Sequence, residues 1–136
     1  LWISAAGPAS NLIVAALALT AIVLLKALNP RVQTFLRFFL SGRGGLPRGF
    51  YPLEGLALIL FYGVLINTYL AVFNLIPVPP LDGSGVLMGL LSAEAAQKYE
   101  RIRPFGFIII LALISLGLLK IIIKPIELVI YAIIGI

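Results

Sequence analysis

The sequence of 136 residues contains no histidine and no cysteine, and only 11% of its residues are charged. An average soluble domain has about 25% charged residues, so this composition excludes an ordinary soluble globular domain. The absence of cysteine excludes disulfides, thiol nucleophiles and iron–sulfur clusters. The absence of histidine excludes a His/Cys metal site built by these residues alone. Any chemistry must therefore use Asp, Glu, Lys, Ser or Tyr side chains, or residues of another segment.

Apolar residues make up 62% of the chain, and the mean hydropathy is +1.16. A bilayer core of about 30 Å takes about 20 helical residues, and backbone groups in lipid must pair within the element. The composition therefore predicts an all-α, polytopic transmembrane helical bundle, and we expect residues 1–136 to form a single membrane domain. The expected elements are three full spans and a partial or interfacial C-terminal helix, at residues 11–28, 55–76, 105–123 and 126–136.

Ten Lys/Arg against five Asp/Glu give a net charge of +5. The basic residues lie almost wholly between or at the ends of the apolar stretches. This placement favours anchoring of the helices and contact with anionic lipid headgroups over binding of nucleic acid. The segment from Val32 to Leu40 is aromatic and is a candidate for an interfacial helix.

Asp82 is the most unusual charge, because it follows an apolar span and the sequence NLIPVPPLDG, residues 74–83. Prolines at 77, 79 and 80 break the helix just as the span ends. A carboxylate at membrane depth is costly, which favours a metal ligand or a proton relay. An Asp-Gly pair is equally typical of an interfacial turn, in which Asp82 is the N-cap of the next helix. Both interpretations stay open on spacing alone.

Asparagines occupy a second set of unusual positions. Asn11 follows Gly7 and Pro8 in the segment AAGPASN, where it is suited to a hydrogen bond across helices or to an extended backbone in a cleft. Asn67 and Asn74 are seven residues apart and share a helix face, where each is expected to bond a neighbouring helix. Packing is the simpler role for all three.

Taken together, these segments resemble the site-2 protease family of intramembrane zinc metalloproteases. The resemblance covers about residues 5–91 and depends on two elements in the expected order. A GPxxN element opens one span, and a more specific NxxPxPxLDG element closes the next (Gly7, Pro8, Asn11; Asn74, Pro77, Pro79, Leu81, Asp82, Gly83).

The resemblance implies hydrolysis of peptide bonds in transmembrane substrates by metal-activated water. It makes Asp82 a zinc ligand beside two histidines of an HExxH helix, with Asn11 and Asn74 positioning the substrate and Gly83 allowing a close turn. Zn²⁺ is thus expected only with the missing histidine ligands, and this chain contributes no catalytic residue. The implied partners are membrane lipids, a transmembrane protein substrate and other membrane subunits.

The sequence has no HExxH, so we expect the 136 residues to be inactive by themselves. A start at Leu1 fits a C-terminal part whose HExxH helix precedes it. The alternatives are a non-catalytic scaffold subunit derived from the family, a helix supplied by another chain, and, more weakly, a proton path through Asp82. The resemblance places the Asp82 side nearer the cytoplasm. The positive-inside rule favours the opposite orientation, with the Asp82 side away from the cytoplasm. Seven basic residues are expected on the other side and three on the Asp82 side (Lys26, Arg31, Arg37, Arg43, Arg48, Lys120, Lys124; Lys98, Arg101, Arg103).

Overall fold

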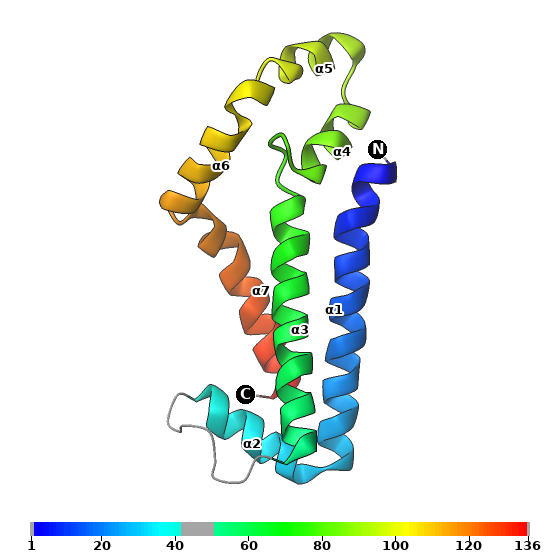
Figure 1. The fold of residues 1–136 in the computed structure, drawn as a ribbon, viewed down its shortest axis with the longest axis vertical. Coiled ribbons are helices and arrows are strands. Elements are labelled where there is room, and N and C mark those ends of the chain that lie inside the picture. Colours follow the sequence, from blue (N-terminus) through cyan, green and yellow to red (C-terminus); the bar gives the residue numbers. More distant parts are fainter. Residues whose placement is uncertain (1, 42–50, 136) are drawn as a thin grey trace. The chain divides into compact units, whose positions relative to one another are not determined.

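The structure is a computed structural model that describes residues 2–41 and 51–135, so Arg43 and Arg48 lie outside the described residues. The described part is helical and contains no strand, in agreement with the predicted all-α class (Figure 1). Its elements are α1 (Trp2–Leu28), α2 (Pro30–Leu40), α3 (Pro52–Asn74), α4 (Asp82–Leu90), α5 (Ala93–Glu100), a 3₁₀ turn η1 (Arg103–Phe105), α6 (Gly106–Ser115) and α7 (Leu118–Ile134).

Helix α1 begins earlier than the sequence predicts. The expected start at residue 11 is wrong, because the helix begins at Trp2 and Ser10 lies inside it, where its hydroxyl donates to Gly7 O at 2.7 Å. A proline inside a helix removes the bond to the carbonyl four residues earlier and crowds that carbonyl, but helices of membrane proteins tolerate it, and α1 continues through Pro8. The predicted end is confirmed: α1 stops at Leu28, and the Asn29 side chain accepts from Arg31 N at 3.0 Å to cap α2.

The chain divides into two compact units, and α1, α3 and α7 contribute to both. One unit contains residues 13–67 and 125–136. In this unit Gly63 of α3 faces Ala18 of α1, since a Cβ built at Gly63 would lie 4.0 Å from the Ala18 Cβ. The ring of Phe61 stacks on Tyr131 with centroids 6.1 Å apart. Its core is apolar and includes Ile22, Val32, Leu36, Ala57, Phe61, Val64, Ile130 and Ile134.

Two basic side chains in the same unit cover the end of α7. Lys26 donates through Nζ to the carbonyl of Ile134, and Arg37 donates through Nε to the carbonyl of Gly135 at 2.9 Å. The last carbonyls of a helix have no partner within it, and cations near that end also interact favourably with the helix dipole. Gly135 has φ +75°, a left-handed conformation typical of the residue after a helix.

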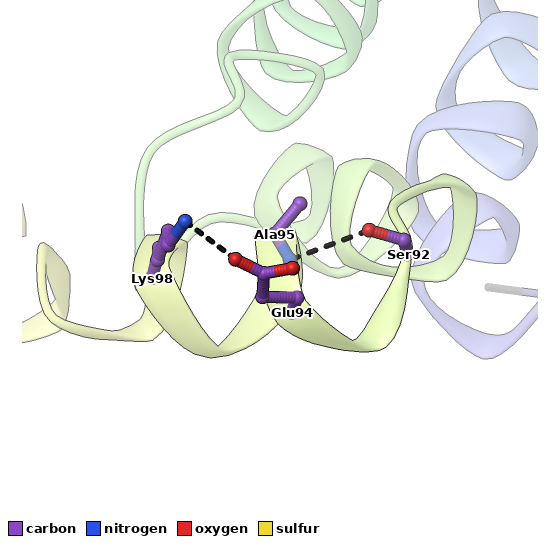
Figure 2. A network of polar contacts seen from close by, with 4 residues as sticks. All are labelled: Ser92, Glu94, Ala95 and Lys98. Carbon is purple, nitrogen blue, oxygen red and sulfur yellow. Dashed lines mark hydrogen bonds and ion pairs between the residues drawn. The ribbon is translucent and has the colours of Figure 1, made fainter.

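The other unit contains residues 1–12 and 68–124. It combines the first turns of α1, the last turns of α3, the proline-containing segment from residue 75 to 81, and helices α4 to α6. Figure 2 shows the polar side of α5: Ser92 caps the helix by accepting from Ala95 N at 3.4 Å, and Lys98 pairs with Glu94 at 2.7 Å. The exposure of both charged side chains makes this pair worth little stability.

The C-terminal helices break at a different place from the predicted one. The sequence predicts one helix over 105–123 and a break at Lys124–Pro125. Instead α6 ends at Ser115, Gly117 has φ +69°, and α7 runs through Pro125 to Ile134. Glycine takes a positive φ without the steric cost that other residues meet, so the chain breaks at Gly117. Pro125 removes one helical hydrogen bond and crowds the preceding turn, and α7 nevertheless continues through it.

Two described helices are long and apolar enough to cross a membrane, namely α1 and α3. A third span arises only if the helical stretch Ala93–Ser115 and α7, which are bent by 59° at their break, count as one. Many large apolar side chains are exposed on these helices, such as Leu17 at 66%, Ile59 at 71% and Ile121 at 69%. Such exposure is typical of a surface that faces lipid rather than water.

Candidate functional site

The two elements singled out in the sequence meet within one unit, at Gly7 and Asp82. A Cβ built at Gly7 would lie 2.6 Å from Asp82 Oδ2, so the carboxylate reaches the backbone of α1 at a position that has no side chain. Figure 1 shows α4, which begins at Asp82, beside the first turns of α1. The fold therefore brings a carboxylate that is 75 residues away in sequence directly onto the GPxxN segment.

A second contact fixes α4 against α1. A Cβ at Gly85 would collide with Ser4 Oγ, so the two helices approach closely where both residues are small. Small residues such as Gly85 are typical of places where helices approach closely. Because Ser4 and Gly7 are three residues apart, they share a face of α1, and α4 lies along that face.

Asp82 is the first residue of α4 rather than its N-cap. The N-cap position is Leu81, whose side chain makes no capping hydrogen bond. The interpretation of Asp82 as an N-cap is therefore wrong. Its side chain is half-buried and reaches toward Gly7 rather than back to the amides of its own helix. This orientation leaves the carboxylate available to a ligand at the α1 surface.

Gly83 allows the chain to turn back onto the end of α3. A Cβ at this position would collide with the carbonyl of Leu75 and would come within 2.5 Å of the carbonyl of Ile76. The residue is buried. The absence of a side chain at position 83 thus determines how close Asp82 lies to the residues that directly follow α3.

The segment from residue 75 to 81 has two further supports, which the sequence did not reveal. The Tyr99 hydroxyl of α5 donates to Pro77 O at 2.7 Å. A Cβ at Gly106, the first residue of α6, would collide with the carbonyl of Pro79. Neither residue belongs to a motif, and both are more than 20 residues from their partners. No local pattern in the sequence carries a signal for such contacts.

The asparagines are placed differently from one another. Asn11 lies four residues after Gly7, on the same face of α1, and Asn74 is the last residue of α3. Both are half-buried and belong to the unit that contains Asp82. Asn67 belongs to the other unit, and its amide nitrogen donates to Gly63 O of its own helix at 2.8 Å. This bond stays within α3 and differs from the hydrogen bond to a neighbouring helix that was expected for Asn67.

The residues around Asp82 can supply one ligand of a zinc centre, the Asp82 carboxylate, but not a complete set of ligands. Carboxylate oxygen is an accepted zinc ligand, and a catalytic zinc has three protein ligands and an open position. Within residues 2–41 and 51–135, no group of three or more His, Cys, Asp or Glu side chains is placed to hold a metal ion. With no histidine in the whole sequence, further ligands of such a centre would have to come from outside these residues.

The sequence profile of peptidase family M50, the site-2 protease family, matches residues 1–117. This chain belongs to peptidase family M50. The resemblance inferred from GPxxN and NxxPxPxLDG is confirmed by this match. The M50 chain is an integral membrane protein, and its described residues include two or three helices that are long and apolar enough to cross a membrane.

Two curated relatives carry names that agree with the family. The chain is 32% identical over 111 residues to "Putative zinc metalloprotease YwhC" of Bacillus subtilis (strain 168), which covers 82% of this chain and 43% of that protein. It is 36% identical over 73 residues to "Putative zinc metalloprotease CPE1693" of Clostridium perfringens, which covers 50% of this chain and 22% of that protein. The M50 chain thus spans less than half of these relatives' length. No solved structure gives a significant match.

Proposed function

We propose that this M50 chain is part of a site-2-type zinc metalloprotease in which Asp82 supplies one zinc ligand. The observation that carries the proposal is the approach of the Asp82 carboxylate to Gly7, because it joins the two family elements at one place. Family membership and the names of the relatives support the same reaction class. The remaining ligands then come from residues outside these 136, and the chain by itself is inactive.

The residues of this chain would hold the carboxylate in place for that chemistry. Bound zinc would supply an activated water for peptide hydrolysis. Gly7 leaves room for the carboxylate on α1, Gly83 sets its distance from α3, and Leu81 occupies the N-cap position, so that the Asp82 side chain is not used for capping.

Asn11 and Asn74 are proposed to position the substrate. A transmembrane substrate must unwind locally before its peptide bond is accessible, and the freed backbone groups then need hydrogen-bond partners. Amide side chains offer both donors and acceptors. Asn11, one turn from Gly7, is well placed for this role, and Asn74 ends α3 where the segment leading to Asp82 begins.

The test compares Asp82→Asn with Glu94→Gln in the complete protein. Both substitutions remove one negative charge with little change of volume, but Glu94 lies exposed on α5, paired with Lys98. We expect Asp82→Asn to abolish stoichiometric zinc and to lower cleavage of a transmembrane substrate by at least about 100-fold, since even outer partners of metal ligands cost 10- to 100-fold. Glu94→Gln should behave as the unaltered protein. Undiminished zinc and cleavage in Asp82→Asn would remove Asp82 from the metal site.

A second candidate function is a non-catalytic membrane scaffold derived from the same family. The observation that favours it is that no described cluster of side chains can hold a metal by itself. The complete reading frame distinguishes the two functions. A frame without HExxH, whose purified product carries no zinc, would leave the scaffold as the function and would overturn the protease proposal.

A further inference from the structure

The segment between α3 and α4, residues 75–81, is held along its backbone by short-range hydrogen bonds, since each of its four N–H groups donates to a carbonyl two to four residues earlier. Three of its residues are prolines, which have no N–H to donate. Its internal hydrogen bonds run from Val78 N to Ile76 O at 2.8 Å and from Leu81 N to Val78 O at 3.0 Å. These local bonds shape the segment, and contacts with α5 and α6 hold it against the rest of its unit.

A polar contact with this segment from a helix distant in sequence comes from Tyr99. Its hydroxyl donates to Pro77 O at 2.7 Å, across 22 residues of sequence. Tyr99 is half-buried on a helix that buries no side chain fully and exposes Lys98 and Glu94 on its surface. Helix α5 is itself fixed at its start by the Ser92 cap (Figure 2). Through Tyr99, helix α5, whose surface is polar, is hydrogen-bonded to the segment that precedes Asp82.

The segment is stiff enough to transmit this contact. Pro79 and Pro80 have φ fixed near −65°, and the residue before each proline is restricted to extended backbone, so the stretch from Pro77 to Asp82 is stiffer than an ordinary loop. Gly106 touches the carbonyl of Pro79 and limits movement in the direction of α6. A shift of the Pro77 carbonyl is therefore passed along the segment rather than absorbed within it.

We propose that Tyr99 is a positioning residue for Asp82: its hydroxyl holds the Pro77 carbonyl and so fixes where the Asp82 carboxylate lies relative to Gly7. This inference rests on the proposed function of Asp82 as a zinc ligand. Tyr99 acts through the proline segment, and its role differs from that of a group that touches metal or substrate.

The experiment uses the complete protein with Co²⁺ in place of zinc and measures cobalt d–d absorption together with kcat and KM. Tyr99→Phe removes only the hydroxyl, and Lys98→Met on the adjacent, exposed position is the matched control. We expect Tyr99→Phe to lower kcat by about 2- to 10-fold, the effect of one lost hydrogen bond, with KM unchanged and the cobalt spectrum altered. Lys98→Met should match the unaltered protein in all three measurements. Replacing Tyr99 by p-aminophenylalanine, which keeps a donor on the ring, should restore kcat and the spectrum.

The outcomes separate this inference from the proposed function. An unaltered spectrum and kcat in Tyr99→Phe, per mole of folded protein, would overturn the role of Tyr99 while Asp82→Asn still loses its metal. Loss of kcat that p-aminophenylalanine does not restore would assign Tyr99 to packing and would equally overturn it. If Asp82→Asn keeps its metal, Asp82 is not a ligand and the proposed function is overturned. The role of Tyr99 as a positioning residue for that ligand is then overturned with it.

Discussion

Gly7 leaves open the space that the Asp82 carboxylate occupies: a Cβ at position 7 would lie 2.6 Å from Oδ2. This is shorter than real Cβ contacts, so a side chain at Gly7 and the present position of Asp82 are mutually exclusive. The glycine of the GPxxN element therefore has a steric role toward the aspartate of the LDG element. The relationship links the two elements physically, which neither element shows when it is considered alone.

The substitution Gly7→Ala is expected to lower metal content and cleavage without destabilising the fold. The atom that must move is the end of a flexible side chain, so the displacement is cheap in energy. Alanine in a helix interior is favoured over glycine by about 1 kcal/mol, which offsets that cost. The measurements are zinc stoichiometry, the rate of substrate cleavage and the melting temperature in detergent.

Gly63→Ala is the matched control for this prediction. It places the same methyl group in another long helix, where the nearest atom would be the Ala18 Cβ at an ordinary 4.0 Å. We expect Gly63→Ala to raise or maintain the melting temperature and to leave zinc content and cleavage unchanged. Equal loss of zinc in both variants would show that the effect is general to the helices and would contradict a specific contact with Asp82.

Gly117 is expected to tolerate asparagine better than alanine. Its φ of +69° lies in the left-handed region, and nothing lies within 4 Å of a Cβ built there. The cost of a substitution is therefore conformational, about 1–2 kcal/mol for alanine and less for asparagine, which visits this region more readily. Thermal unfolding of the two variants in the same detergent checks the order, and equal melting temperatures would contradict it.

Lys26→Met is expected to cost more stability than Arg37→Leu. Both cations donate to carbonyls at the end of α7, but the Lys26 bond to Ile134 is partly buried whereas the Arg37 bond to Gly135 is exposed. We expect losses of about 1–2 kcal/mol and about 0.5–1 kcal/mol in the free energy of unfolding. Because the two carbonyls are adjacent, the loss of unfolding free energy in the double variant should differ from the sum of the two single losses. Chemical denaturation in detergent measures all three, and a larger loss for Arg37→Leu would contradict the prediction.

The fold was predictable where composition and strong local signals act. The apolar stretches predicted helices, and Asn29–Pro30 predicted the end of α1, since an asparagine cap followed by proline is a local signal. The break at Gly117 was missed because Lys124 and Pro125 carry the more obvious sequence signal. Only the backbone shows that Gly117 takes a positive φ while α7 passes through Pro125.

The sequence was enough to predict which residues belong to the site, but not which of them contact one another. Asp82 stood out because a carboxylate follows a span and three prolines, and the two elements gave the family. The contact of Asp82 with Gly7 and the hydrogen bond of Tyr99 to Pro77 depend on how helices pack across long stretches of sequence. Such contacts leave no periodicity or local motif. The roles of Asn11 and Asn74 stay predictions for the same reason.

Membrane orientation follows from labelling two positions that the spans separate. The 136 residues contain no cysteine, so Ser41→Cys or Gln97→Cys adds a single thiol to this part of the protein. Both residues are exposed, Ser41 just after α2 and Gln97 on α5. If the Asp82 side faces the cytoplasm, as the family resemblance implies, an impermeant maleimide added to intact cells should label position 41 and spare position 97. The positive-inside rule, counted on these residues alone, predicts the reverse pattern. Labelling of position 97 but not 41 in intact cells would therefore reject the proposed orientation, and labelling of both after permeabilisation is the control for reactivity.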